Sequence, residues 1–409
     1  MKKTTTFLLM AAALFAAAPL QSAEVSADQA RIAARNWLRR NPKPLQAKYA
    51  SANVTTVRSV AGDDGKSLFH VADVGDGGFV VTSGDTELTP IIAFSDSGSF
   101  VMSEDSPLYA LLWRDLSCRR AALAASKAGG RSSQKFATGD GAEESVLSEN
   151  EAEWAELLNA KAGAKFRVDE STGISDVCVA PLVKSKWTQG SWNGQKTFNY
   201  YTPGGYVCGC VATAFGQIMR LWQYPASSVA ASFECAVSES FDYEYDDVKT
   251  TLTTRGGTYN WSSMPLTRDA CTTDVQREAI GHLIYDFSVS TGTWFTRGAS
   301  SSSTWDGYLS LRRTFGYASV NFYQPWWGEQ DEDYVSEHAL KGKNIAAHEV
   351  YRNAILGSLD AGMPVVIGVY AHAMVVDGYG YNGSSAVYCH INCGWDGLDD
   401  ASTTSWARR

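Results

Sequence analysis

The sequence contains no long uninterrupted apolar run and no concentration of positive charge. The apolar stretch from Phe7 to Ala18 is shorter than the roughly 18 residues that a membrane-spanning helix needs, and no later segment reaches that length. The formal net charge is −9, with Lys and Arg scattered along the chain, so nucleic acid is not an expected partner. The glycine-rich turns match no phosphate-binding fingerprint, so no nucleotide cofactor is expected.

The first residues have the pattern of a secretory signal peptide. Lys2 and Lys3 supply the positive start, Phe7 to Ala18 the apolar stretch, and Ala23 or Ala27 a small residue for cleavage. We therefore expect residues 1–23 to be removed and the mature protein to be secreted, either extracellular or periplasmic, with no membrane span.

Eight cysteines in an exported chain suggest disulfides, because extracellular compartments are oxidising. If Cys118 and Cys210 are set aside, an even set remains whose pairing the sequence does not decide: Cys178, Cys208, Cys235, Cys271, Cys389 and Cys393. Zinc binding by Cys208-x-Cys210 with Cys389-His390-x-x-Cys393 is an alternative. Zinc pairs usually have two to four intervening residues, so no metal is expected.

The length of 409 residues and 44% hydrophobic content favour two domains. Ser26 can cap an amphipathic helix that stops at Asn41-Pro42. Segments with strand character follow it, and the first two are separated by a glycine turn that predicts a hairpin. The expected strands are 67–74, 79–83 and 91–94. Residues 24–126 are therefore predicted to form a small α+β domain.

A change in composition marks the expected boundary between the domains. Residues 127–141 are rich in Gly, Ser, Lys and Ala, and acidic residues crowd 140–156. We expect 127–174 to be a linker that contains the maturation site, with possible processing points at Lys127, Arg131, Lys135, Lys161 and Lys165. Residues 175–409 mix helix and strand without a repeat and are predicted to form a second α+β domain.

One helix is predicted to carry a reactive thiol. Apolar residues at helical spacing (Val211, Phe215, Ile218 and Trp222) follow Cys210, and Pro225 ends the helix. At a helix N-terminus the free backbone N–H groups favour a thiolate, so the pKa of Cys210 is expected to be lowered, more so beside a histidine. Gly209 removes side-chain bulk where a substrate backbone must approach.

A thiolate nucleophile needs a base, a group that orients the base, and donors for the oxyanion. We expect His372 to be the general acid/base, Asn392 to orient it through the side-chain carbonyl, and Gln189 with the Cys210 N–H to face the oxyanion. Strands at 365–370 and 373–376, a turn at 377–380 and a returning strand would bring His372 beside Asn392. His390 is the reserve base.

These residues resemble the streptopain family, secreted papain-like cysteine peptidases that are made as zymogens. The resemblance lies in motifs along nearly the whole chain: Gly77-Gly-Phe-Val-Val-Thr-Ser-Gly-Asp85, Trp187-Thr-Gln189, Gly209-Cys-Val-Ala-Thr-Ala214, His372-Ala373 and His390-Ile-Asn392 with Gly394-Trp395. It implies a papain-like two-lobed cysteine peptidase domain preceded by a small α+β inhibitory propeptide domain at 24–126. It also implies endopeptidase action on protein or peptide substrates, and inhibition by the chain's own propeptide.

The chain departs from the family pattern at several positions near the expected site. Cys393 follows Asn392 where the family usually has tryptophan, Ala371 precedes His372 where glycine is usual, and Leu-Asp-Asp-Ala-Ser replaces an aromatic-rich closing strand. Besides the catalytic residues, Trp187, Gly209 and Trp395 are expected to bind substrate, and no cofactor is expected. The alternatives are a secreted protein- or glycan-binding module rich in surface aromatics, or an inactive peptidase homologue with an altered C-terminus.

Overall fold

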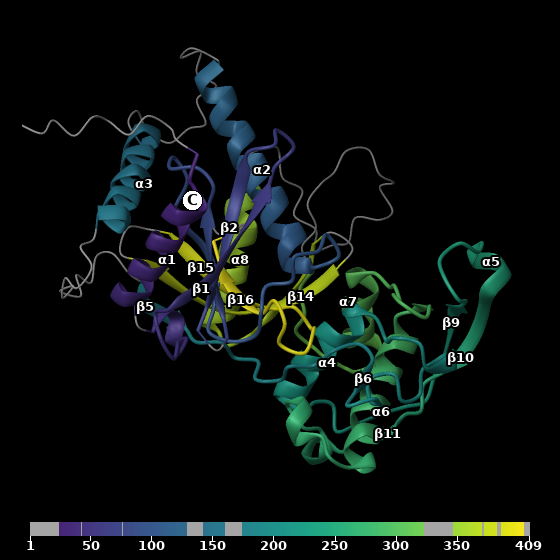
Figure 1. Cartoon of the computed structure of the whole chain (residues 1–409). Helices are drawn as coiled ribbons and strands as arrows, with labels where there is room; N and C mark the ends of the chain where they lie inside the picture. Colours follow the sequence, from purple (N-terminus) through teal and green to yellow (C-terminus); the bar gives the residue numbers. More distant parts are fainter. Residues whose placement is uncertain are drawn as a thin grey trace, which may run out of the picture.

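The computed structural model describes residues 24–41, 43–75, 77–128, 142–159, 174–322, 347–369, 372–382 and 386–404. The expected signal peptide and the processing candidates Arg131, Lys135, Lys161 and Lys165 lie outside these residues. A strand-rich part and a helix-rich part lie side by side, and a hairpin projects from the helix-rich part (Figure 1). None of the helices in the described part of the chain is long and apolar enough to cross a membrane.

The N-terminal part begins with α1 (Ala27–Arg40), whose first turn is closed by reciprocal hydrogen bonds between Ser26 and Gln29. Four antiparallel strands follow, and the expected hairpin is confirmed because Phe69 pairs with Ser83 and Asp73 with Phe79. The elements after α1 are a short 3-10 turn (Pro44–Gln46), β1 (Val54–Ala61), β2 (Ser67–Val74), β3 (Phe79–Ser83), β4 (Ile91–Ser95) and α2 (Pro107–Ala128).

The expected linker contains a helix, α3 (Ala142–Asn159), that docks on the N-terminal domain. Trp154 has no exposed surface, and its indole N–H donates to the Leu88 carbonyl at 3.0 Å. The Asn36 side chain donates to the Leu157 carbonyl at 2.7 Å, and that of Asn150 to the Glu87 carbonyl at 2.7 Å. The segment expected to be a linker therefore contains a helix whose apolar face is buried despite its acidic composition.

The helix-rich part is built around α4 (Cys210–Trp222), which packs against α6 (Asp274–Ser290) and α7 (Thr304–Arg313). The projecting hairpin in Figure 1 joins β9 (Ser232–Val237) to β10 (Lys249–Thr253) through α5 (Tyr245–Val248). Short elements complete this part: β6 (Ser191–Trp192), β7 (Gln195–Lys196), β8 (Ser227–Ser228), β11 (Gly257–Thr258), β12 (Trp294–Phe295) and 3-10 turns at Pro203–Gly205, Trp261–Ser263 and Arg268–Ala270.

The C-terminal strands continue the sheet of the N-terminal domain. Ser402 pairs with Phe94 and Thr403 with Ala93, so one sheet runs β1-β2-β3-β4-β16-β15-β14-β13, with β5 also paired to β14. The two domains expected from the sequence therefore share a sheet. The added elements are β5 (Ile174–Val179), α8 (Ala347–Asp360), β13 (Val365–Val369), β14 (His372–Asn382), β15 (Val387–Asn392) and β16 (Ala401–Thr403).

The hairpin that carries His372 is confirmed, because β13 and β14 pair antiparallel from Val369 opposite His372 to Val365 opposite Val376. The turn expected at 377–380 is wrong. Strand β14 runs on to Asn382, because Tyr379 and Tyr381 pair with both β15 and β5. The pairing with β15 has a register irregularity between Val376 and Gly378.

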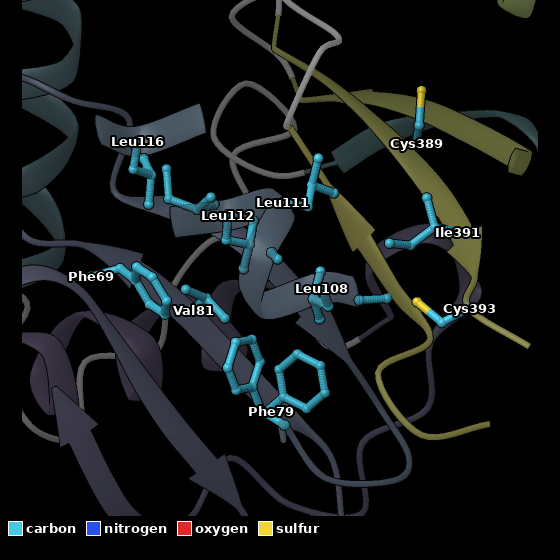
Figure 2. Packing of buried hydrophobic residues seen from close by; sticks show 14 of the residues in the cluster. Phe69, Phe79, Val81, Leu108, Leu111, Leu112, Leu116, Cys389, Ile391 and Cys393 are labelled. Atoms are coloured by element: carbon cyan, nitrogen blue, oxygen red, sulfur yellow. The ribbon is translucent and has the colours of Figure 1, made fainter. Parts of the chain in front are cut away.

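Both faces of the shared sheet are covered by helices. Helices α1 and α3 lie on one face, and α2 and α8 lie on the other. Figure 2 shows α2 inserting Leu108 and Leu112 between Phe79 of β3 and Ile391 of β15, with the Cys393 side chain in the same cluster. One hydrophobic core therefore joins the N-terminal domain to the strands that carry the candidate site.

Candidate active site

Cys210 is the first residue of α4, as the sequence predicts, and it is half-buried. Hydrogen bonds fix the chain just before it. The Ser300 hydroxyl donates to the Val207 carbonyl at 2.6 Å, and the Cys208 N–H donates to the Gln189 carbonyl at 2.9 Å. The thiol is therefore presented from a rigid loop at the start of a helix.

Gly209 caps this helix with φ of 90°, in the left-handed region that favours glycine. A Cβ at this position would lie 2.8 Å from the Ser300 carbonyl oxygen. Glycine is required here because another part of the same chain comes close, whereas the sequence argument had assigned the close approach to a substrate backbone.

His372 is the first residue of β14, and the residue after it contacts the thiol. The backbone N–H of Ala373 faces the Cys210 sulfur and acts to lower the pKa of the thiol. The His372 Nε2 atom lies 2.8 Å from the Cys393 carbonyl oxygen, and the imidazole meets the Trp395 ring edge to face at 5.8 Å between centroids. Since a carbonyl can only accept, Nε2 carries the proton in this contact.

Burial shifts the pKa values of the thiol and the imidazole in opposite directions, and both shifts favour the neutral form. It raises the pKa of Cys210, although the N–H groups of Ala373, Cys210 and Val211 act to lower it. It lowers the pKa of His372, although the hydrogen bond to the Cys393 carbonyl acts to raise it. The expected lowering of the thiol pKa is therefore wrong for this state, because burial outweighs the helix N-terminus.

Asn392 does not occupy the expected place beside the imidazole. It pairs with Val375, not with His372, and its side chain faces α4. Its Oδ1 accepts from Gln217 Nε2 at 2.9 Å and from the Gly394 N–H at 3.0 Å, while its Nδ2 donates to the Ser185 carbonyl at 2.8 Å. The group that contacts the His372 ring nitrogen is the Cys393 backbone carbonyl, one residue further along, and a backbone atom gives no sequence signal.

The two tryptophans predicted to bind substrate differ in position. Trp187 has no exposed surface, packs against Phe198 and donates from its indole N–H to the Pro265 carbonyl, so the expected contact with substrate is corrected to a core role. Trp395 is partly exposed beside His372. Gln189 is also partly exposed, on the loop whose carbonyl holds Cys208.

A cluster of ionisable residues that the sequence reasoning missed lies next to Cys393. The Asp400 carboxylate accepts the Cys393 N–H at 2.8 Å, and His390 Nδ1 lies 2.6 Å from the Asp377 carboxylate. Burial lowers the pKa of His390, but the charge of Asp377 and the hydrogen bond to it outweigh burial, so this pKa is raised. Burial raises the pKa of Asp400 to about 6. The side chain of His390 thus pairs with Asp377 and not with the Cys210 thiol.

The N-terminal domain contacts the same segment. The Asp399 carboxylate accepts the Val101 N–H at 2.9 Å and the Ser106 hydroxyl at 2.6 Å, at the start of α2. Lys186 Nζ donates to the Ser97 hydroxyl at 3.3 Å. Burial raises the pKa of Asp399, although these hydrogen bonds act to lower it. Segment 393–400 therefore contacts the imidazole through Cys393 and Trp395 and the N-terminal domain through Asp399.

No disulfide joins any of the eight cysteines in the structure, and Cys208, Cys235, Cys271, Cys389 and Cys393 are buried. Among the residues that the structure describes, no three His, Cys, Asp or Glu side chains are grouped so that they could hold a metal ion.

Comparison with known proteins agrees with this arrangement. The profile of the Peptidase C10 family matches residues 192–402, and that of the Spi protease inhibitor matches residues 22–119. The thiol protease/hemagglutinin PrtT of Porphyromonas gingivalis is 26% identical over 395 residues, which is 94% of this chain but only 39% of PrtT. Streptopain of Streptococcus pyogenes is 22% identical over 363 residues, covering 84% of this chain and 75% of streptopain.

A solved structure shares the fold. A fragment of prointerpain A from Prevotella intermedia superposes with a TM-score of 0.55 at 20% identity, covering 86% of this chain and 93% of the fragment. The expected fold class, a papain-like peptidase domain after a small α+β inhibitory domain, is thereby confirmed.

Proposed function

Because the chain belongs to the Peptidase C10 family, we propose that it is a cysteine endopeptidase made as an inactive zymogen. The observation that carries the proposal is the junction of α4 and β14. There the Cys210 thiol lies at a helix N-terminus, and the N–H of Ala373, the residue after His372, acts on the sulfur. Thiol acyl transfer requires a base close to the nucleophile, and His372 is the histidine next to this contact.

In the proposed reaction, the Cys210 thiolate attacks a peptide carbonyl and His372 protonates the leaving amine. The resulting acyl-enzyme is hydrolysed by water that His372 deprotonates. Gln189 and the Cys210 backbone N–H donate to the oxyanion. The Cys393 carbonyl holds Nε2–H of His372 and thus leaves Nδ1 of the ring as the nitrogen that exchanges a proton with sulfur. Asn392 supports this arrangement indirectly, through its bonds to Gln217 and Gly394.

The inhibitory unit is proposed to include α3, so that it spans Glu24–Asn159 and the peptidase domain begins near residue 174. The support is the burial of Trp154 and its bond to Leu88. This unit shares the sheet from which His372 projects, and it bonds to Asp399. In this form of the chain burial raises the pKa of Cys210 and lowers that of His372, and both shifts favour the neutral groups.

The substrates are proposed to be proteins or peptides, and the enzyme is proposed to be secreted after removal of residues 1–23. The support for secretion is the charged start and apolar stretch of the N-terminus.

The purified proform tests the function. Wild type, Cys210→Ala and the matched thiol control Cys118→Ser are incubated under reducing conditions and followed by gel, intact mass, casein digestion and labelling by the epoxide inhibitor E-64. We expect wild type and Cys118→Ser to lose the inhibitory unit, cleave casein and take one label at Cys210, while Cys210→Ala stays whole. Wild type that is inert and unlabelled would instead support the binding module or the inactive homologue.

A further inference from the structure

The orientation of His372 depends on how the peptide groups around Cys393 are held. The carbonyl that accepts from the imidazole belongs to the peptide group between Cys393 and Gly394, and the N–H of that group donates to Asn392 Oδ1. The preceding peptide group presents the Cys393 N–H, which donates to Asp400 Oδ1 at 2.8 Å. Two side-chain acceptors therefore fix the carbonyl that contacts the ring, and the second is a carboxylate.

Asp400 is a charged side chain in a buried position. It is 6% exposed, between the end of β15 and the start of β16. Lys186, His390 and Asp377 are the charged or titratable groups that act on it. Burial of a carboxylate is unfavourable unless its hydrogen bonds compensate, and the Cys393 N–H donates to the Asp400 carboxylate.

We propose that Asp400 is a positioning residue for catalysis, holding the Cys393 peptide so that its carbonyl keeps the Nε2–H tautomer of His372 aimed at the thiol. The inference rests on the proposed function, since His372 must act as the base. Asp400 bonds to the Cys393 N–H and acts on the ring through Cys393, whose carbonyl contacts it.

Three variants of the full proform, each activated to the mature enzyme, separate positioning from general stability. Asp400→Ala removes the acceptor, whereas Asp400→Asn keeps an acceptor oxygen and removes only the charge. Asp377→Asn is the matched control, because it alters a fully buried carboxylate of the same cluster that bonds to His390 and the Val183 N–H, not to Cys393.

We expect Asp400→Ala to lower kcat by about 100-fold with KM changed by less than about threefold, because a small misplacement of a catalytic group has effects of that size. Asp400→Asn should restore kcat to within about threefold of wild type, since the geometry of the acceptor is kept. Asp377→Asn should alter the melting temperature without reproducing the loss of kcat. Equal kcat losses in Asp377→Asn and Asp400→Ala, or an unchanged kcat in Asp400→Ala, would overturn the proposal.

A second measurement does not depend on activity. In proform carrying ¹⁵N-labelled histidine and the Cys210→Ala change, the ring nitrogens of His372 are assigned by comparison with His372→Gln. We expect the Nε2–H form in the background protein and in Asp400→Asn, and a mixture of tautomers in Asp400→Ala. If wild type has no peptidase activity, the proposed function fails, while this spectrum still decides whether Asp400 orients the ring.

Discussion

Replacing Trp154 with alanine should loosen the inhibitory unit only when α3 remains joined to the peptidase domain. The Trp154 side chain has no exposed surface, lies in the core that α1 and α3 form on the sheet, and bonds to the Leu88 carbonyl. Removal of a buried tryptophan of this kind costs about 3–5 kcal/mol. At about 1.4 kcal/mol for each factor of ten, the contact between α3 and the inhibitory domain should weaken by about 10²-fold to several thousandfold.

The assay uses the uncleavable Cys210→Ala proform with a site for an unrelated protease placed either around Lys135 or around Lys165. A cut at Lys135 leaves α3 covalently attached to the peptidase domain, so α3 contacts and the pairing of β4 with β16 together retain the inhibitory fragment. A cut at Lys165 lets α3 leave with the inhibitory unit. Dissociation is followed by size exclusion and by the rate at which the fragment exchanges with labelled fragment.

Trp154→Ala should therefore accelerate release strongly after the Lys135 cut and little after the Lys165 cut. Trp154→Phe keeps most of the ring but loses the hydrogen bond, so its effect should correspond to only about 1 kcal/mol. Ala152→Gln, on the exposed side of α3, is the control and should leave release unchanged. Equal acceleration after both cuts, or none after the Lys135 cut, would refute the inclusion of α3 in the inhibitory unit.

Three further predictions follow from the buried ionisable groups. Because burial raises the pKa of Cys210 above its ordinary 9.0, iodoacetamide should alkylate Cys210 of the zymogen appreciably only at alkaline pH. Release of the inhibitory unit should move the curve of alkylation rate against pH to lower pH. Coincident curves for the zymogen and the mature enzyme would contradict this. Asp399→Ala removes the acceptor for Val101 and Ser106, so the lag before E-64 labelling should shorten by about tenfold, and an unchanged lag would count against the contact. Folding raises the pKa of Asp400 from 3.8 to about 6, so the stability that its protonated form contributes to the zymogen is present below pH 3.8 and is lost as the pH rises through 6. Asp400→Asn should therefore raise the free energy of unfolding in urea by up to about 3 kcal/mol at neutral pH and hardly at pH 4. A difference that does not depend on pH would contradict the assignment.

Local patterns in the sequence predicted much of the fold. The cap at Ser26, the hairpin around the glycine turn after Val74, and the start of α4 at Cys210 all depend on residues close in sequence, and the structure confirms each of them. The composition of the linker was misleading, because an acidic segment reads as solvated chain unless the position of its few apolar residues is weighed. Trp154 and Leu157, one helical turn apart, were the available signal for a docked helix.

Contacts between distant segments were beyond the sequence argument. The pairing of β4 with β16 joins residues about 300 positions apart, and no local pattern specifies it. The register of β14 and β15 decides which residue reaches the imidazole. With Val375 opposite Asn392, the asparagine faces α4 and the next carbonyl faces His372. A change of one residue in register would have exchanged these faces, so a pattern of period two could not choose between them.

Segment 393–400 contacts both the catalytic imidazole and the inhibitory domain. At one end the Cys393 carbonyl holds the imidazole, and its N–H is held by Asp400; next to Asp400, the Asp399 carboxylate binds the inhibitory domain at the start of α2. Because Asp399 and Asp400 are consecutive, we expect a backbone shift on release of α2 to reach the peptide that orients His372. Removal of the inhibitory unit would then free this loop and change how the imidazole is held.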